Sequence, residues 1–215
     1  MSFDRRSLLT ASAGLIAAPA LATPLAPPAA RTGAVVPAQA AEDPRRTIRA
    51  IGPANAPMVV QEFFSLTCSH CGAFAREVFP RVKAELVQTG RIRFVWRDFP
   101  LDQVALRASA VARTFPAEGY EPFLHALFTT QDRWAYARGA DHKAEIGRIA
   151  ALAGMPQATF EAAWADDNLA RWILEQAQQG EREYRINATP SFIFGTRMVS
   201  GNIPFDRFVQ EASRA

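Results

Sequence analysis

Cysteine is scarce in this chain of 215 residues: there are two, Cys68 and Cys71, and they lie three positions apart. So few cysteines exclude a scaffold that depends on many disulfides. Histidine is also scarce, and its three copies have no paired spacing, so the sequence does not offer the four ligands of a zinc site. A stripe of basic charge with interleaved aromatic residues is missing too, which argues against nucleic acid as a partner.

Long hydrophobic runs are absent as well. The apolar stretch at residues 8–18 is too short and too rich in small residues for a stable membrane span. Over the whole chain, 49% of residues are hydrophobic and 21% are charged, which is typical of a globular protein with a sizeable core. The length fits one domain with room for a subdomain.

Residues 1–22 have the three parts of an export signal. A polar start carries Arg5 and Arg6, small apolar residues follow, and Ala20-Leu21-Ala22 fits the pattern that signal peptidase needs. The paired arginines before Ser7-Leu8-Leu9 resemble a twin-arginine signal, and a general secretory signal is the alternative. We therefore expect a signal peptide and a periplasmic protein.

Alanine and proline dominate residues 23–45. Such a segment cannot bury enough apolar surface to fold, and proline stiffens it. It is predicted to be a linker, or part of an anchor if the signal is not cleaved. The folded domain is predicted over residues 46–215.

Strand patterns occur at both ends of this domain. Residues 58–64 predict a buried strand that Glu62 interrupts, and alternation predicts another at 91–98. Strand patterns return at 191–194 and 198–200, joined by a tight turn.

Helical patterns fill the rest of the domain. Apolar residues at spacings of three and four after Cys71 predict a helix with a kink at Pro80. From 103 to 185 only helical patterns occur, and Pro204 is expected to open a last helix. The expected helices of this block are 104–112, 121–129, 143–153, 159–165 and 169–183, with breaks at 116–119, 134–141 and 154–156.

The elements follow the order strand, helix, strand, a long helical block, hairpin and helix. A parallel pair joined by a helix, with a hairpin at the end, forms a thioredoxin-like sheet. The predicted class is therefore α/β, a thioredoxin-like fold with an inserted all-helical subdomain at about 103–185.

The spacing of Cys68 and Cys71 suits a redox pair. In the first turn of a helix, thiols at i and i+3 lie close enough to join, and the first normally faces solvent. The unpaired N–H groups and the helix dipole favour a thiolate there, so we expect a lowered pKa for Cys68. His70 can add a donor or a positive charge, and a stabilised thiolate makes the disulfide an oxidant.

Three alternatives for the pair stay open. A structural disulfide would close a loop of about four residues and would stabilise little. A metal site would need further ligands, which have no suitable spacing. Two packed core cysteines would carry no chemistry.

Segments near both ends of the domain resemble the DsbA-like branch of the thioredoxin superfamily. Residues 62–71, Glu-Phe-Phe-Ser-Leu-Thr-Cys-Ser-His-Cys, are similar to its active-site segment, and residues 52–57 are similar to its usual lead-in. Residues 187–192, Asn-Ala-Thr-Pro-Ser-Phe, resemble its cis-proline loop, and residues 195–205 resemble its closing hairpin and helix. The resemblance covers residues 47–215, with the helical insertion matched in length and pattern only.

The resemblance implies a role for each matching residue. Cys68 would be the nucleophile that forms a mixed disulfide, Cys71 would resolve it, and His70 would stabilise the Cys68 thiolate. Pro190 would be cis and would press its loop against the disulfide; an ordinary trans proline at a strand entry is the alternative. Thr189 would bind an extended substrate chain through its backbone.

Glu62 and Ser69 complete the expected site. Glu62 matches a position where this branch often has a buried acid, and a buried carboxyl has a raised pKa and could exchange protons with Cys71. An exposed or salt-bridged glutamate is the alternative. Ser69 stands where the best-known oxidants have proline, and we expect it on the substrate side of the site.

The leading hypothesis is an exported thiol:disulfide oxidoreductase that oxidises cysteine pairs in reduced, unfolded envelope proteins. A membrane quinone-linked reductase would reoxidise it, and no metal or organic cofactor is expected. The alternatives are an isomerase or reductase on the same fold, and a redox-inactive binding protein or chaperone.

Overall fold

The computed structural model describes residues 43–214. The expected signal peptide at 1–22 lies outside these residues, as does the expected linker at 23–45 except for its last three residues. Asp43 caps a 3₁₀ turn at Pro44–Arg46. Arg45 in this turn forms an ion pair with Asp166 at 2.8 Å. The end of the expected linker therefore contacts the folded domain.

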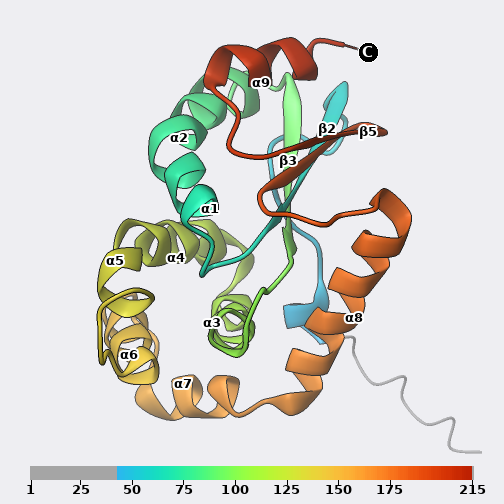
Figure 1. The fold of residues 1–215 in the computed structure, drawn as a ribbon. Coiled ribbons are helices and arrows are strands. Elements are labelled where there is room, and N and C mark those ends of the chain that lie inside the picture. Colours follow the sequence, from blue (N-terminus) through green and yellow to red (C-terminus); the bar gives the residue numbers. More distant parts are fainter. Residues whose placement is uncertain (1–42, 215) are drawn as a thin grey trace, which may run out of the picture. The chain divides into compact units, whose positions relative to one another are not determined.

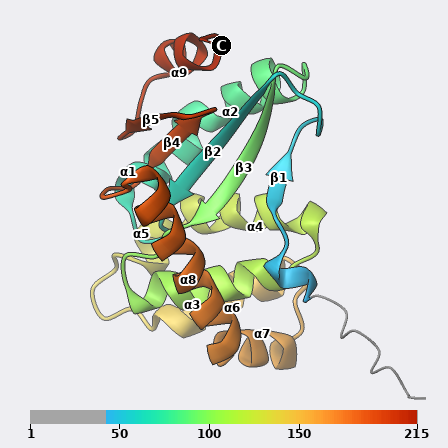
Figure 2. The same ribbon diagram turned by 90° about the vertical axis from the view of Figure 1, so that its right-hand side faces the viewer.

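Five strands form one sheet in the order β1-β3-β2-β4-β5 (Figure 1, Figure 2). The strands are β1 (Arg49–Ile51), β2 (Met58–Phe64), β3 (Ile92–Asp98), β4 (Ser191–Phe194) and β5 (Arg197–Ser200). β2 and β3 are parallel, and the other neighbouring pairs are antiparallel. This is the predicted sheet with one addition, β1, whose three residues are too few to show an alternating pattern.

The helix after the cysteine pair connects β2 to β3. It consists of α1 (Ser69–Ala73), a π-helical segment (Phe74–Val78), α2 (Phe79–Val82) and a second π-helical segment (Lys83–Val87). Proline lacks an N–H and crowds the preceding turn, so the helix widens around Pro80, and the N–H of Phe79 bonds to Phe74 O, five residues back. The predicted kink is thus a local widening of the helix.

Six helices lie between β3 and β4 and form the inserted subdomain. They are α3 (Gln103–Thr114), α4 (Ala117–Thr129), α5 (Gln131–Trp134), α6 (His142–Leu152), α7 (Gln157–Trp164) and α8 (Asp167–Tyr184). The predicted all-helical insertion in the sheet is confirmed. No helix within residues 43–214 is long and apolar enough to cross a bilayer.

The predicted break at 116–119 is wrong in its extent. Ala117, Glu118 and Gly119 form the first turn of α4, and only Phe115-Pro116 separates α3 from α4. Proline and glycine suggest a longer turn by composition. However, Pro116 stands just before the helix, where its missing N–H costs no hydrogen bond, so α4 begins directly after it.

Helices cover both faces of the sheet (Figure 2). α1, α2 and the last helix, α9 (Phe205–Ala212), lie on one face, and α8 lies on the other. Gly180 of α8 packs against Phe63 of β2 so closely that an added Cβ would lie 2.2 Å from Phe63 Cε1. Glycine thus lets the backbone of α8 approach the sheet.

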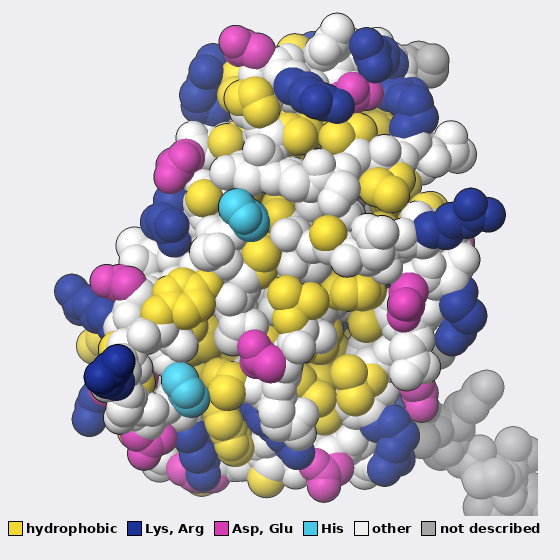
Figure 3. Space-filling view, in the orientation of Figure 1, with side chains coloured by type: hydrophobic (Ala, Val, Ile, Leu, Met, Phe, Trp, Pro, Cys, Tyr) yellow, Lys and Arg dark blue, Asp and Glu magenta, His cyan; other side chains and the backbone are white. Residues whose placement is uncertain are grey.

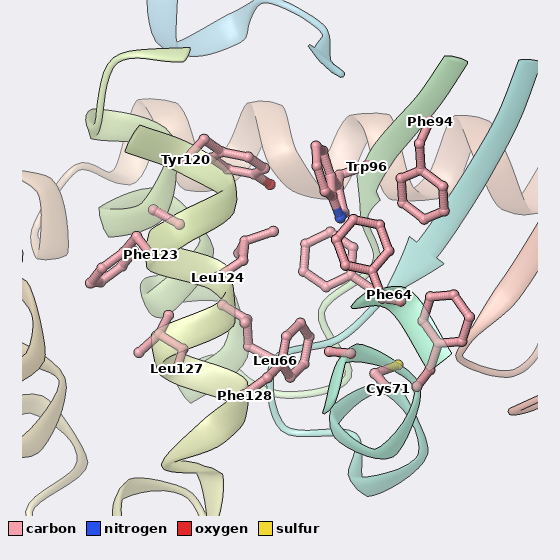
Figure 4. Close-up of a cluster of buried hydrophobic side chains, with 14 of the residues drawn as sticks. Phe64, Leu66, Cys71, Phe94, Trp96, Tyr120, Phe123, Leu124, Leu127 and Phe128 are labelled. Atoms are coloured by element: carbon pink, nitrogen blue, oxygen red, sulfur yellow. The ribbon is translucent and has the colours of Figure 1, made fainter. Parts of the chain in front are cut away.

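Aromatic side chains join the sheet to α4 (Figure 4). The rings of Phe64 and Phe128 meet edge-to-face with centroids 5.9 Å apart, and Trp96 meets Tyr120 in the same way at 6.0 Å. Cys71 belongs to the same buried cluster. The packing of α4 on the sheet therefore also supports the helix that carries the cysteines.

A buried ion pair joins the insertion to the sheet. Arg113 of α3 donates to Asp98 at the end of β3, with Nε and Oδ2 2.5 Å apart, and both side chains are almost fully buried. Arg113 also donates to the carbonyls of Arg45 and Thr47, while Arg49 of β1 donates to the Arg113 carbonyl. Loss of either charge would leave the other buried and unpaired, so this pair should contribute strongly to stability.

Candidate active site

Cys68 and Cys71 lie at the N-terminal end of α1, where the spacing predicts them. Cys68 is the N-cap residue, with an extended backbone (φ −84°, ψ 121°), and Cys71 lies in the first turn. The Cys68 carbonyl accepts a bond from the Gly72 N–H at 3.1 Å and so begins the helix. Both cysteines are free thiols. Cys68 is 9% exposed and Cys71 is 0% exposed, so only Cys68 is accessible from solvent.

The surroundings of Cys68 favour its thiolate. A hydrogen bond from the Cys71 thiol is the largest cause, and burial opposes it. The Thr189 side chain and the backbone N–H groups of Cys71 and His70 act in the same direction as Cys71. Together they lower the pKa of Cys68 to about 5.

Cys71 is shifted in the opposite direction. Burial and its hydrogen bond to Cys68 raise its pKa well above the ordinary value, and the charges of Glu62 and Cys68 raise it further. At neutral pH the reduced pair therefore holds one thiolate, on Cys68, and one thiol, on Cys71. The two sulfurs therefore differ in both solvent access and charge.

The loop before β4 lies directly against Cys68. The Thr189–Pro190 peptide bond is cis, and Cys68 Sγ is 3.2 Å from the Thr189 carbonyl oxygen. The loop is held at both ends, since Ser191 Oγ donates to Ala188 O at 2.8 Å and Gly201 N–H donates to Pro190 O at 2.8 Å. The trans alternative for Pro190 is wrong, and the structure brings Pro190 and Thr189 to the cysteine pair.

Glu62 is buried in the middle of β2, with Trp96 and Phe192 beside it on the neighbouring strands. It is 3% exposed, and its Oε1 has no hydrogen-bond partner among the described residues. Burial, with a smaller effect of the charge on Cys68, raises its pKa to about 8. The alternative of an exposed or salt-bridged glutamate is therefore wrong.

A small cavity connects Glu62 with the surface of α4. Its volume is about 20 Å³, enough for one water molecule. The lining includes apolar side chains of the core and, on α4, Glu121 and the exposed His125. A water molecule in this cavity would give the carboxyl of Glu62 a partner through which it can exchange protons with solvent.

Ser69 and His70 lie on the exposed side of the first turn of α1. The His70 imidazole has no side-chain hydrogen bond to Cys68. Its backbone N–H is the group that acts on the Cys68 sulfur. His70 therefore stabilises the Cys68 sulfur through its backbone N–H, which any residue at the second position of the helix would also supply.

Two residues of the insertion also contact residues 65–68, the turn before α1 that we call the active-site turn. Gln131 donates to the carbonyls of Leu66 and Cys68, and Tyr136 donates to the carbonyl of Thr67. Sequence reasoning missed both, because a lone glutamine and a lone tyrosine in a helical block carry no spacing signal. Residues 43–214 hold no group of three His, Cys, Asp or Glu side chains that could bind a metal.

A thioredoxin family, described as "Thioredoxin", matches residues 45–211, and the chain belongs to this family. A Rickettsia felis protein provisionally named a protein-disulfide oxidoreductase is 25% identical over 166 residues, 77% of this chain and 59% of that protein. A similarly named protein of Rickettsia prowazekii is 24% identical, covering 77% of this chain and 60% of that protein. This chain therefore spans less than two thirds of the length of these curated relatives.

Solved structures place the fold more closely. Alpha-DsbA1 of Wolbachia pipientis superposes with a TM-score of 0.73 at 28% identity, covering 78% of this chain and 90% of that chain. A protein-disulfide isomerase of Novosphingobium aromaticivorans has a TM-score of 0.68 at 19% identity, over 78% and 98% of the two chains. The predicted thioredoxin-like fold with a helical insertion is confirmed.

Proposed function

We propose that this protein is a DsbA-like thiol:disulfide oxidoreductase that oxidises cysteine pairs in other proteins. The observation that carries the proposal is the placement of the two sulfurs. Cys68 lies at the helix N-cap beside Thr189, and Cys71 is fully buried behind it, which lowers the pKa of Cys68 to about 5 and raises that of Cys71. A stabilised thiolate favours the reduced pair, so the disulfide form is a strong oxidant. The names of the Rickettsia and Wolbachia proteins support the same activity.

The reaction starts from the Cys68–Cys71 disulfide. A substrate thiolate attacks Cys68 Sγ, the bond to Cys71 breaks, and Cys71 leaves and takes up a proton. A second substrate thiolate then attacks the substrate sulfur of the mixed disulfide and expels Cys68 as a thiolate. The substrate loses two electrons and gains a disulfide, while the protein gains two electrons as one thiolate and one thiol.

Glu62 is assigned the proton donor for Cys71. With a pKa of about 8, its carboxyl is mostly protonated at neutral pH. Cys71 with its raised pKa is a poor leaving group as a thiolate, so a nearby proton lowers the barrier. The cavity at α4 then offers a route by which Glu62 regains its proton.

The proposed substrates are reduced, unfolded proteins. Beside the active-site turn two large apolar side chains are exposed, Leu101 at 56% and Tyr136 at 50%. The backbone N–H of Leu101 donates to Ser65 Oγ, and the Tyr136 hydroxyl donates to the Thr67 carbonyl. On the face drawn in Figure 3, apolar side chains gather toward the centre and charged ones lie mostly around the margin. Thr189 would hold an extended substrate through its backbone, and Ser69 would face the substrate.

Export and reoxidation complete the proposal. The features of residues 1–22 support delivery by the twin-arginine route to the periplasm. In that compartment cysteine pairs are oxidised. A membrane quinone-linked reductase is the proposed electron acceptor. Comparing oxidation of a dithiol peptide with refolding of scrambled ribonuclease separates an oxidase from an isomerase, and we expect the former activity to dominate.

Titration of Cys68 tests the proposal directly. As the pH is lowered, the thiolate absorbance of the reduced protein near 240 nm should fall with a midpoint at about pH 5. The reason is that hydrogen bonds in the folded protein stabilise the Cys68 thiolate and lower its pKa. The same titration on a Cys68→Ser protein should show no transition below pH 8, since the pKa of Cys71 is raised. A midpoint near the free-cysteine value of about 8.5 would sink the oxidase assignment.

Stability against pH tests the state of Glu62. A raised carboxyl pKa stabilises the fold fully below the unfolded value of 4.5, and this contribution is lost as pH rises through about 8. In the disulfide form, which has no Cys68 thiolate, the unfolding free energy should decline over this range by up to about 5 kcal/mol. A Glu62→Gln protein should lack that decline in urea unfolding. An equal decline in both proteins would contradict a buried neutral Glu62.

A further inference from the structure

The active-site turn is bonded to the insertion through its backbone carbonyls. Gln131, the first residue of α5, is 2% exposed, and its Nε2 donates to Leu66 O at 2.7 Å and to Cys68 O at 2.9 Å. The amide thus uses both of its N–H groups on the turn. Its Oε1 lies so close to Gly72 that a Cβ there would sit 2.2 Å away. Gln131 therefore packs between the active-site turn and the first residues of α1.

A further hydrogen bond holds the carbonyl of Thr67, the residue between Leu66 and Cys68. The Tyr136 hydroxyl donates to Thr67 O at 2.8 Å. Burial, followed by the charges of Cys68 and Cys71, raises the pKa of Tyr136, so its hydroxyl keeps its proton and remains a donor. The carbonyls of three successive residues, 66 to 68, are thus held by residues 131–136, which we call the α5 segment.

The α5 segment is itself firmly anchored. Trp134 is fully buried, and its Nε1 donates to Leu127 O of α4 at 2.7 Å. The carbonyl of Trp134 lies 2.6 Å from His142 Nδ1 at the start of α6. These contacts fix the segment between two helices of the insertion, so it can hold a defined geometry.

Orientation of the Cys68 backbone decides which groups face its sulfur. The Cys68 carbonyl accepts two bonds, one from the Gly72 N–H that begins the helix and one from Gln131, so Gln131 adds a second constraint on the orientation of this peptide. In the observed orientation the sulfur meets the backbone N–H groups of His70 and Cys71. The Cys71 thiol also donates to this sulfur, and the charge of Cys68 in turn raises the pKa values of Glu62 and Tyr136.

We propose that the α5 segment is a positioning element of the redox site: Gln131 and Tyr136 hold the carbonyls of residues 66–68 and thereby set the reactivity of Cys68. The inference rests on the proposed oxidoreductase function and adds that the helical insertion sets the reactivity of Cys68. Neither residue touches the reacting sulfur bond, so both act through the turn.

Two substitutions test this positioning role. Gln131→Met keeps the volume but removes both donors, and Tyr136→Phe removes one hydroxyl from a half-exposed residue, which should leave folding intact. Gln157→Met, on the exposed surface of α7 in the same insertion, is the matched control. For each protein, the thiolate titration of Cys68, the equilibrium constant with glutathione and the melting temperature are measured.

We expect the midpoint of the Cys68 titration to rise by about one unit in Gln131→Met and about half a unit in Tyr136→Phe. The equilibrium constant for reduction of the protein disulfide by glutathione should fall about tenfold for each pH unit by which the midpoint rises, because a less stabilised thiolate makes the disulfide a weaker oxidant. Gln157→Met should match the parent protein. Lower melting temperatures with unchanged midpoints and equilibrium constants would overturn the positioning role and leave only support of the fold.

The parent protein separates this inference from the function on which it rests. A parent that oxidises a dithiol peptide, with variants that behave like it, contradicts the inference alone. A parent with a midpoint near that of free cysteine and no oxidation contradicts the proposed function. If Gln131→Met does not fold, the Tyr136→Phe protein decides, because its missing hydroxyl lies at the surface.

Discussion

Replacing Cys71 with serine is expected to leave the protein covalently joined to its substrate. Cys68 remains a thiolate that attacks a disulfide, but no second thiol is present to release the mixed disulfide. With oxidised glutathione, intact mass spectrometry should show close to one glutathione per protein, and turnover should fall by roughly three orders of magnitude. The wild-type protein should instead form its internal disulfide and carry no adduct.

The reciprocal variant is the control for this trap. In Cys68→Ser, the remaining Cys71 is 0% exposed and keeps its proton, so no adduct should form on the same time scale. Adducts that appear as fast on Cys71 as on Cys68 would contradict the assignment of nucleophile and buried partner.

Loss of the buried ion pair should have the largest effect on stability. Arg113→Met leaves Asp98 charged, almost fully buried and without its partner, and such a change typically costs 3–5 kcal/mol, so a loss of about 4 kcal/mol is expected. Urea unfolding at neutral pH should show a lower midpoint with an unchanged slope. The double variant Asp98→Leu/Arg113→Met should recover most of the loss, since no charge remains buried.

Arg107 offers a matched control on the same helix. It pairs with Asp167 at 2.7 Å, but Asp167 is 74% exposed, so water screens the pair. Arg107→Met should therefore cost less than about 1 kcal/mol. Equal losses in the Arg107 and Arg113 variants would mean that burial does not distinguish the two pairs.

Local patterns explain what could be predicted from the sequence. β2 and β4 are short apolar runs, and the lowered pKa of Cys68 depends most on the Cys71 thiol three positions on and also on the N–H groups at the helix start, so both can be deduced from neighbouring residues. Pro80 indicates an irregular helix. Composition alone could not show that the irregularity takes the form of two π-helical segments, because the widening depends on how the helix packs.

Contacts between distant residues explain what could not be predicted. Gln131 bonds to Leu66 across 65 positions, and Arg49 bonds to Arg113 across 64. Neither pair has a spacing or composition that distinguishes it from other polar residues in a sequence. The cysteine pair of the candidate site could thus be located from the sequence, whereas the residues that support its turn could be found only from the coordinates.

Gly180 has a consequence for residues far from it. α8 is the only covalent connection from the insertion to the loop that holds Thr189, and its spacing from β2 depends on the bare backbone of Gly180 over the ring of Phe63. A methyl group at this position would push the helix outward and carry its C-terminal end along. The loop of Thr189 beside Cys68 would then shift, although nothing at the cysteine pair had been altered.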